Sequence, residues 1–393
     1  MHKFYSFIYL HPWDLLNGNA EKVFEKIAGW GINGINIATS YHAGYFLHSH
    51  NQDHKMYMAE DGVVYFPPNE RFFQATSIKP RQAQISKNFD CIGKAQQLCS
   101  KFGLKMMSWT VCNHNTPLGL KNPEHTITNI FGDSYPHALC PSSKQVRTYV
   151  RGMCKNIATD YDFDSIVLEA NDFRGIPHGH HHERYGTILR SLEESLMSLC
   201  FCQWCIDLSN KDGLDLIPIS QNIRKHMEVF FNESPIFPAN LPSNLNQMLD
   251  SYPKLIDMIG FRQDVESSLV RDIKTDLKQI GSTSLLAQSS FRNDYSPNID
   301  GFVVSCYGNS IDEITKKITH QRSISGSKKL FAGIRTGFGE VLSQNTLAEM
   351  VISVQKSGGD GIGFYNYSET PIKVLNWIEP CLLYTSPSPR DAT

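Results

Sequence analysis

A dense group of cysteines is the first chemical feature of the chain. Three of them lie within six residues, in Cys200-Phe-Cys202-Gln-Trp-Cys205. Three thiolates at the start of a helical segment can provide three corners of a zinc tetrahedron. Cys140 is the candidate fourth ligand, with Cys112 and Cys154 as alternatives. Free cysteine is often simply buried, so the pattern predicts either a structural zinc site or a group of apolar thiols.

A carboxylate, Glu169, ends the apolar run that begins at Asp164. Val167 and Leu168 place a dry environment behind it. A partly desolvated carboxylate suits general acid chemistry, and we interpret Glu169 as a candidate catalytic residue. The structural alternative is that Glu169 pairs with an arginine such as Arg335 and only stabilises its surroundings.

A polar loop follows, with four histidines and an acid in His178-Gly-His180-His181-His182-Glu183. Imidazoles and a carboxylate are ready metal ligands, but contiguous histidines do not share one face. We expect His180 and His181 to line a substrate pocket beside Glu169. A metal site and an inert solvated loop are the alternatives.

Eight apolar runs alternate with helical segments along the chain. These runs cover residues 3–10, 32–38, 104–111, 163–169, 284–289, 301–307, 330–335 and 361–367. This alternation predicts an α/β fold, a (β/α)8 TIM barrel, with large insertions after the second and fourth strands. A doubly wound sheet is the alternative, although no Gly-x-Gly-x-x-Gly follows the first strand. Residues 56–66 are predicted to form a hairpin that turns at Asp61-Gly62.

In a barrel of this kind the active site lies at the carboxyl ends of the strands. The residues expected there are rich in aromatic rings, amides and carboxylates, which suits stacking on sugar faces and bonding to sugar hydroxyls. A phosphate site would instead favour glycine-rich loops and cations. The predicted substrate-binding residues are His11, Asp14, Tyr41, His42, Trp109, His114, Asp172, His180, His181, Tyr307, Tyr365 and Asn366.

Glycoside hydrolysis generally uses two carboxylates. Asp14, Asp172, Glu340 and Glu369 compete for the second role. Glu340 follows the seventh strand, where many glycosidase barrels hold their nucleophile, and it is predicted as the second catalytic residue. It also lies close to Gly337 and Gly339 and could simply begin the next helix.

Two parts of this pattern resemble the zinc-bearing β-galactosidase barrels of glycoside hydrolase family 42. They are the acid at the tip of the fourth strand and the cysteines at 140, 200, 202 and 205. The runs 138–149 and 361–367 also resemble those of uncharacterised glycosidase-like barrels. The resemblance implies that Glu169 is the acid/base and that the four cysteines bind zinc. It departs at Leu168, where the family has asparagine, and no nucleophile motif follows the seventh strand, so neither nucleophile nor substrate carries over.

Composition narrows the possible classes of function further. The 393 residues carry a formal net charge of −2 and are 41% hydrophobic. No basic stripe suits a nucleic acid, and no apolar run is long enough for a membrane span. Ten cysteines without a secretion signal suggest free thiols and a cytoplasmic protein. Residues 1–380 are predicted to form one domain with insertions at about 40–88 and 171–282. Residues 381–393 resemble a translated sequencing adapter, and we expect no structure there.

The predicted function is therefore a carbohydrate-active enzyme, most readily a glycoside hydrolase with a structural zinc. A metal-dependent sugar isomerase or epimerase is the first alternative, with Glu169 and the histidine loop as metal ligands. A non-catalytic carbohydrate-binding barrel is the second.

Overall fold

The computed structural model describes residues 4–16, 20–176, 187–233, 241–281, 283–288 and 293–383. His180 and His181, with the rest of the predicted histidine loop, lie outside the described residues. No helix in the described part of the chain is both long and apolar enough to cross a membrane.

Eight parallel strands close into a barrel, because β1 pairs with both β2 and β13. The predicted (β/α)8 fold is therefore confirmed, and each predicted apolar run overlaps one of its strands. The strands are β1 (Tyr5–Leu10), β2 (Gly34–Tyr41), β6 (Lys105–Val111), β9 (Ser165–Glu169), β10 (Ser284–Ala287), β11 (Gly301–Ser305), β12 (Lys329–Arg335) and β13 (Gly361–Tyr365). They are almost continuously buried, as expected for a parallel sheet covered by helices.

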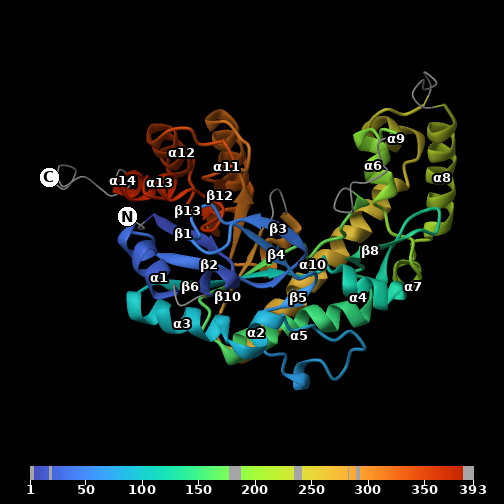
Figure 1. Ribbon diagram of the computed structural model, residues 1–393. Helices are drawn as coiled ribbons and strands as arrows, with labels where there is room; N and C mark the ends of the chain where they lie inside the picture. Colours follow the sequence, from blue (N-terminus) through green and yellow to red (C-terminus); the bar gives the residue numbers. More distant parts are fainter. Residues whose placement is uncertain are drawn as a thin grey trace.

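Helices surround the barrel (Figure 1), and their ends follow local sequence signals. Ser310 begins α11 with a capping box to Glu313, and Gly103 ends α3 in a left-handed conformation. Between β10 and β11 the connection is a 3-10 helix, η5 (Asn293–Asn298). The surrounding helices are α1 (Ala20–Gly29), α3 (Cys91–Phe102), α5 (Lys144–Asp160), α10 (Leu255–Ile280), α11 (Ile311–Ser325), α12 (Gln344–Lys356), α13 (Ile372–Leu375) and α14 (Ile378–Leu383).

The insertion after β2 contains a hairpin, but not the predicted one. β4 (Met56–Ala59) pairs with β3 (Gly44–Leu47), whereas β5 (Val63–Val64) joins the edge of β2. The turn at Asp61-Gly62 therefore separates two strands that belong to different sheets, and the predicted hairpin over 56–66 is wrong. The physical reason is that β5 finds backbone partners at Ser40 and Tyr41, which extend beyond the barrel rim. Short helices η2 (Glu70–Phe72) and α2 (Gln84–Asn88) complete this insertion.

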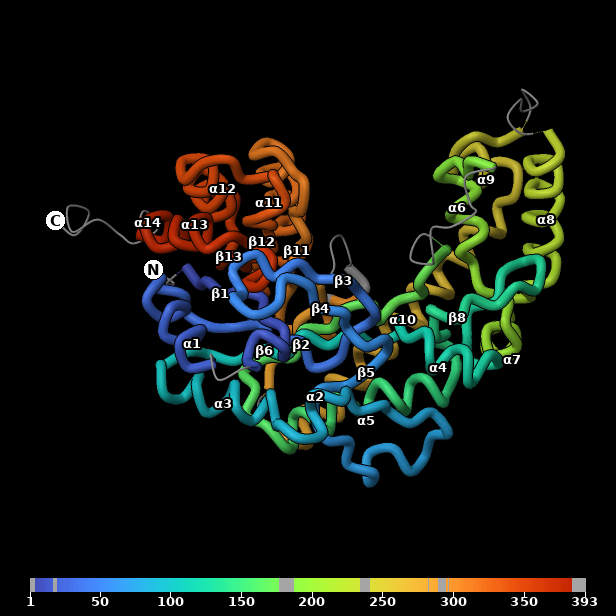
Figure 2. The backbone as a smooth tube through the Cα atoms, in the orientation of Figure 1, coloured from blue at the N-terminus to red at the C-terminus, as the bar shows by residue number. Residues whose placement is uncertain are grey.

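The insertion after β9 forms a lobe with its own hydrophobic core. Figures 1 and 2 show α6 (Ser191–Met197), α8 (Leu216–Glu233) and α9 (Leu245–Ser251) standing beside the barrel, with α10 running between the two parts. The lobe also contains α7 (Gln203–Lys211) and packs on the hairpin of β7 (Thr126–Thr128) and β8 (Ser134–Leu139), which sequence patterns did not reveal. α4 (Thr116–Lys121) packs against β8.

Candidate active site at the barrel mouth

Glu169 is the last residue of β9, at the carboxyl end of the barrel. The indole Nε1 of Trp109, on the neighbouring strand β6, donates a hydrogen bond to Glu169 Oε2. Trp109 is fully buried, and its ring packs edge-on against Tyr9 at a centroid distance of 5.2 Å. Trp109 thus holds the carboxylate, and Arg335, the arginine named as an example in the structural alternative, pairs with Glu340 instead. The charge of Glu169 also interacts with that of Arg174, whose pKa it raises.

Tyrosine side chains surround this carboxylate. Tyr9, Tyr41, Tyr307 and Tyr365 come from four different strand ends, and Tyr365 lies 5.3 Å from Tyr9 and 5.2 Å from Tyr307 between ring centroids. Desolvation raises the pKa of all four hydroxyls, that of Tyr365 to about 12, and the negative charge of Glu169 raises each pKa further. The four hydroxyls therefore remain protonated at neutral pH.

Glu340 is held on both carboxylate oxygens. Oε1 pairs with the guanidinium of Arg335, and Oε2 accepts a hydrogen bond from the Gly308 backbone N–H at 2.7 Å. The arginine also lies over the Tyr307 ring, 5.4 Å from its centroid, which connects Glu340 to the aromatic lining.

Glu369 is a further carboxylate near the mouth. Its backbone N–H donates to Asn366 Oδ1 at 2.9 Å, and Asn366 Nδ2 donates back to Glu369 Oε2. Burial raises the pKa of Glu369, with Asn366 and Arg335 opposing the shift. The charges of Glu369 and Glu169 both raise the pKa of Tyr41 and of Tyr365, so the two tyrosines are near both carboxylates.

The remaining predicted site residues divide into a buried layer and an outer group. His11 is fully buried and stacks on Trp13 at 4.3 Å, and its ring also contacts Phe46 at 4.9 Å and both Tyr41 and Trp109 at 5.4 Å between centroids. His11 therefore supports the mouth from below. Asp14 accepts a 2.8 Å hydrogen bond from the His11 backbone N–H and faces away from the mouth, into a separate cavity.

The outer group comprises His42, His114 and Asp172. His42 stacks on Tyr41 and on His114, both at 4.4 Å. Asp172 accepts a 2.6 Å hydrogen bond from Arg174 Nε. These residues follow β2, β6 and β9, which are adjacent in the barrel.

Tyr9 is the main residue of the mouth that was not predicted. The alternation of Tyr5, Phe7 and Tyr9 along β1 carried the signal, because these three rings contact one another successively and face one side of the strand. The Tyr9 hydroxyl donates to Gln288 Oε1 at 3.3 Å, across the barrel.

The predicted cysteine cluster does come together. Cys140 Sγ lies 3.6 Å from Cys205 Sγ, 3.6 Å from Cys202 Sγ and 3.8 Å from Cys200 Sγ. Four sulfurs placed about 2.3 Å from a central zinc in a tetrahedron would be about 3.8 Å apart, whereas a disulfide needs about 2.05 Å. All four thiols are buried in the lobe core and free, and among the described residues they are the one group whose ligand atoms converge in this way.

The comparisons with known proteins support the fold. No protein-family model matches the sequence, and no curated protein matches it. The structure is similar to α-L-fucosidase isoenzyme 2 from Paenibacillus thiaminolyticus (TM-score 0.60, 13% identity, covering 98% of this chain and 49% of that chain). It is also similar to a β-galactosidase from Marinomonas ef1 (TM-score 0.59, 9% identity, covering 97% and 59%).

A third similar structure is the PgaB (BpsB) glycoside hydrolase domain from Bordetella bronchiseptica (TM-score 0.56, 10% identity, covering 98% of this chain and 99% of that domain). The chain therefore spans about half of the fucosidase and nearly the whole of the PgaB domain. At these identities the likeness establishes the glycosidase-like TIM-barrel fold and nothing finer.

Proposed function

We propose that this protein is a glycoside hydrolase in which Glu169 is the general acid/base. The observation that carries the proposal is the placement of Glu169: it ends a central strand, accepts a hydrogen bond from buried Trp109, and stands among protonated tyrosine hydroxyls. A carboxyl group fixed in this way can give a proton to the leaving oxygen of a sugar and recover it from water. The tyrosine rings and hydroxyls would stack on and bond to the sugar.

Glu340 is the proposed second carboxylate. Its ion pair with Arg335 and its hydrogen bond from the Gly308 backbone N–H fix the orientation of its carboxylate. Glu369 is the competitor: burial raises its pKa, and its Oε2 already accepts a hydrogen bond from Asn366 Nδ2. Since both oxygens of Glu340 are engaged, the specific alternative is a carbohydrate-binding barrel that does not hydrolyse its ligand.

The test is hydrolysis of a panel of aryl glycosides by the wild type and by Glu169→Gln, Glu340→Gln and Glu369→Gln. We expect turnover by the wild type and losses of about 10²–10⁴-fold in kcat for the first two variants, with a smaller loss for the third. Binding of a glycoside without turnover in every protein would support the binding barrel instead. A Glu369→Gln loss that exceeds the Glu340→Gln loss would exchange the two assignments.

We also propose that the four cysteines hold a structural zinc ion. Their spacing fits a closed tetrahedral site, which leaves no position for a substrate. Such a site would tie Cys140, which precedes α5, to the lobe segment that carries the other three cysteines. The metal-dependent isomerase hypothesis depends on the histidine loop, which lies outside the described residues.

A further inference from the structure

A second cavity lies beside the barrel mouth, between α1, the loop that joins β3 to β4, and the residues that follow β1 and β13. Its volume is about 180 Å³, which is too large for a single ion and too small for an oligosaccharide. Trp13, one of its walls, stacks on His11, and the opposite side of this aromatic layer faces Tyr41 and Trp109 of the mouth. The cavity is therefore separate from the site around Glu169.

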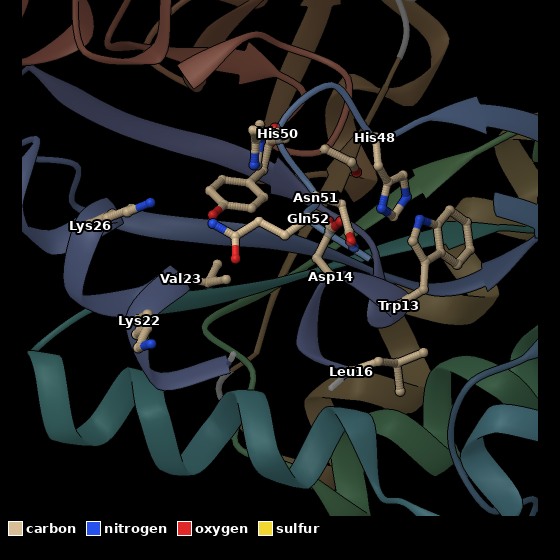
Figure 3. Close-up of a pocket in the computed structure, with 12 residues that line it drawn as sticks. Trp13, Asp14, Leu16, Lys22, Val23, Lys26, His48, His50, Asn51 and Gln52 are labelled. Atoms are coloured by element: carbon tan, nitrogen blue, oxygen red, sulfur yellow. The ribbon is translucent and has the colours of Figure 1, made fainter. Parts of the chain in front are cut away.

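Two buried polar groups at one end of the cavity have no hydrogen-bond partner. They are Nε1 of Trp13, whose side chain is 3% exposed, and Nε2 of His48, which is 6% exposed. Figure 3 shows the indole and imidazole nitrogens turned toward each other at this end, with Asn51 beside them. Leaving such groups unpaired costs stability, so a ligand that bonds to them would be favoured.

The opposite end of the cavity is cationic. Lys22 and Lys26 lie one helical turn apart on α1, and Figure 3 shows both at the end away from Trp13 and His48. Among the residues that the structure describes, neither the Lys22 nor the Lys26 ammonium forms an ion pair with a carboxylate. Asp14, Ser368 and Gln52 also line the cavity.

We propose that this cavity binds one monosaccharide-sized polyol that carries a single anionic group, either a carboxylate or a phosphate. The anionic group would lie against Lys22 and Lys26. The hydroxyl groups would bond to the indole N–H of Trp13, the imidazole of His48 and the carboxyl group of Asp14. The cavity matches this ligand class because one of its ends is cationic and the other is neutral and offers hydrogen-bond donors and acceptors. This site does not depend on hydrolysis at Glu169.

The proposal is tested by calorimetric titration of the full-length protein at constant ionic strength with glucuronate, glucose 6-phosphate, glucose and inorganic phosphate. We expect one equivalent of at least one anionic sugar to bind, with glucose and inorganic phosphate each roughly tenfold weaker. Whichever anionic sugar binds more tightly identifies the anionic group. Equal binding of glucose would overturn the role of the cationic end, and equal binding of inorganic phosphate would overturn the sugar part.

Variants locate the site. Lys22→Gln and Lys26→Gln change exposed side chains, and each is expected to weaken binding of the anionic sugar roughly fivefold. Lys316→Gln, an equally exposed lysine on α11, is the matched control and should change nothing. Trp13→Phe keeps an aromatic ring but removes the N–H, and should weaken the sugar probes and spare inorganic phosphate.

Glu169→Gln tests whether binding of the anionic sugar depends on the carboxylate at the mouth. Binding of the anionic sugar should survive in this variant, even if the protein hydrolyses no glycoside at all. Loss of binding in Glu169→Gln, or lysine variants that behave like Lys316→Gln, would contradict the proposed cavity site. Absence of binding by every probe would contradict it as well.

Discussion

Asp14 is the residue whose charge state has the clearest consequence for stability. Burial raises its pKa to about 7, although the His11 backbone N–H and Ser368 partly oppose the shift. In the unfolded chain the carboxyl group ionises near pH 3.8. Between about pH 4 and pH 7 the unfolded state therefore releases this proton more readily than the folded state does, and Asp14 lowers stability increasingly as the pH rises.

We predict that Asp14→Asn stabilises the protein more at pH 8 than at pH 5, by about 2 kcal/mol, because the carboxyl group keeps some access to water. The asparagine Oδ1 can still accept the His11 bond, so the substitution changes mainly the charge. Urea denaturation at the two pH values measures the difference. An equal effect at both pH values would show that the pKa of Asp14 is the same in the folded and the unfolded protein.

The site residues differ in how far sequence could predict them. Glu169 and Trp109 could be placed because they occur in recognisable strands and the chemistry of a barrel is at the strand ends. The burial of His11 under Trp13 could not be predicted, because it depends on the short 3-10 turn η1 (Pro12–Leu15), which folds back after β1. The pairing of Arg335 with Glu340 depends on a loop whose course no periodicity encodes.

At the scale of single elements, β13 depends on close approach to β1. A Cβ added to Gly363 would lie 2.4 Å from the Phe7 ring, which is fully buried and cannot move aside. We predict that Gly363→Ala destabilises the fold by about 2 kcal/mol or more. Gly29→Ala is the control, because nothing lies within 4 Å of that position in α1, and it should be neutral or slightly stabilising. Chemical denaturation of both variants measures the difference, and equal free energies of unfolding would contradict the close packing of β13 against β1.

The cysteine cluster should control the lobe and leave the barrel mostly unaffected. Its four thiols lie in the core formed by α6, α7, α8, α9 and the β7–β8 hairpin, whereas the barrel strands belong to a different core. We predict about one zinc per chain, lost in Cys202→Ser, with amide exchange at least tenfold faster in α7 and α8 and unchanged in β1 and β2.

Cys306→Ser is the matched control for that experiment, since Cys306 is a buried free cysteine outside the cluster. It should retain the metal and the exchange pattern of the lobe. If Cys202→Ser binds as much zinc as the wild type, or if exchange rises equally in lobe and barrel, the cluster is only a group of buried thiols.

At the scale of the whole molecule, the barrel was predictable and the lobe was not. Eight buried apolar runs at regular intervals leave few topologies, and a closed parallel barrel is the simplest. The position of the lobe depends on contacts between residues far apart in sequence. Arg147 and Arg151 of α5 pair with Asp272 and Asp276 of α10, each 125 residues away. No local pattern reveals such pairs.

The predicted end of the domain at residue 380 is close to the end of the described chain. α14 continues through Leu383, and Cys381 within it is fully buried, so this helix crosses residue 380. The named helices of the lobe and the lining residues of the second cavity lie within the described residues.

The most direct test of the central claim is the dependence of Glu169→Gln activity on the leaving group. A general acid matters most when the leaving oxygen is basic. We therefore predict that the variant loses about 10³-fold in kcat/KM on alkyl glycosides and on unsubstituted phenyl glycosides. On 2,4-dinitrophenyl glycosides, whose leaving group is weakly basic, the predicted loss is less than about tenfold. An equal loss on both classes, or no loss on either, would contradict the assignment of Glu169 as the acid.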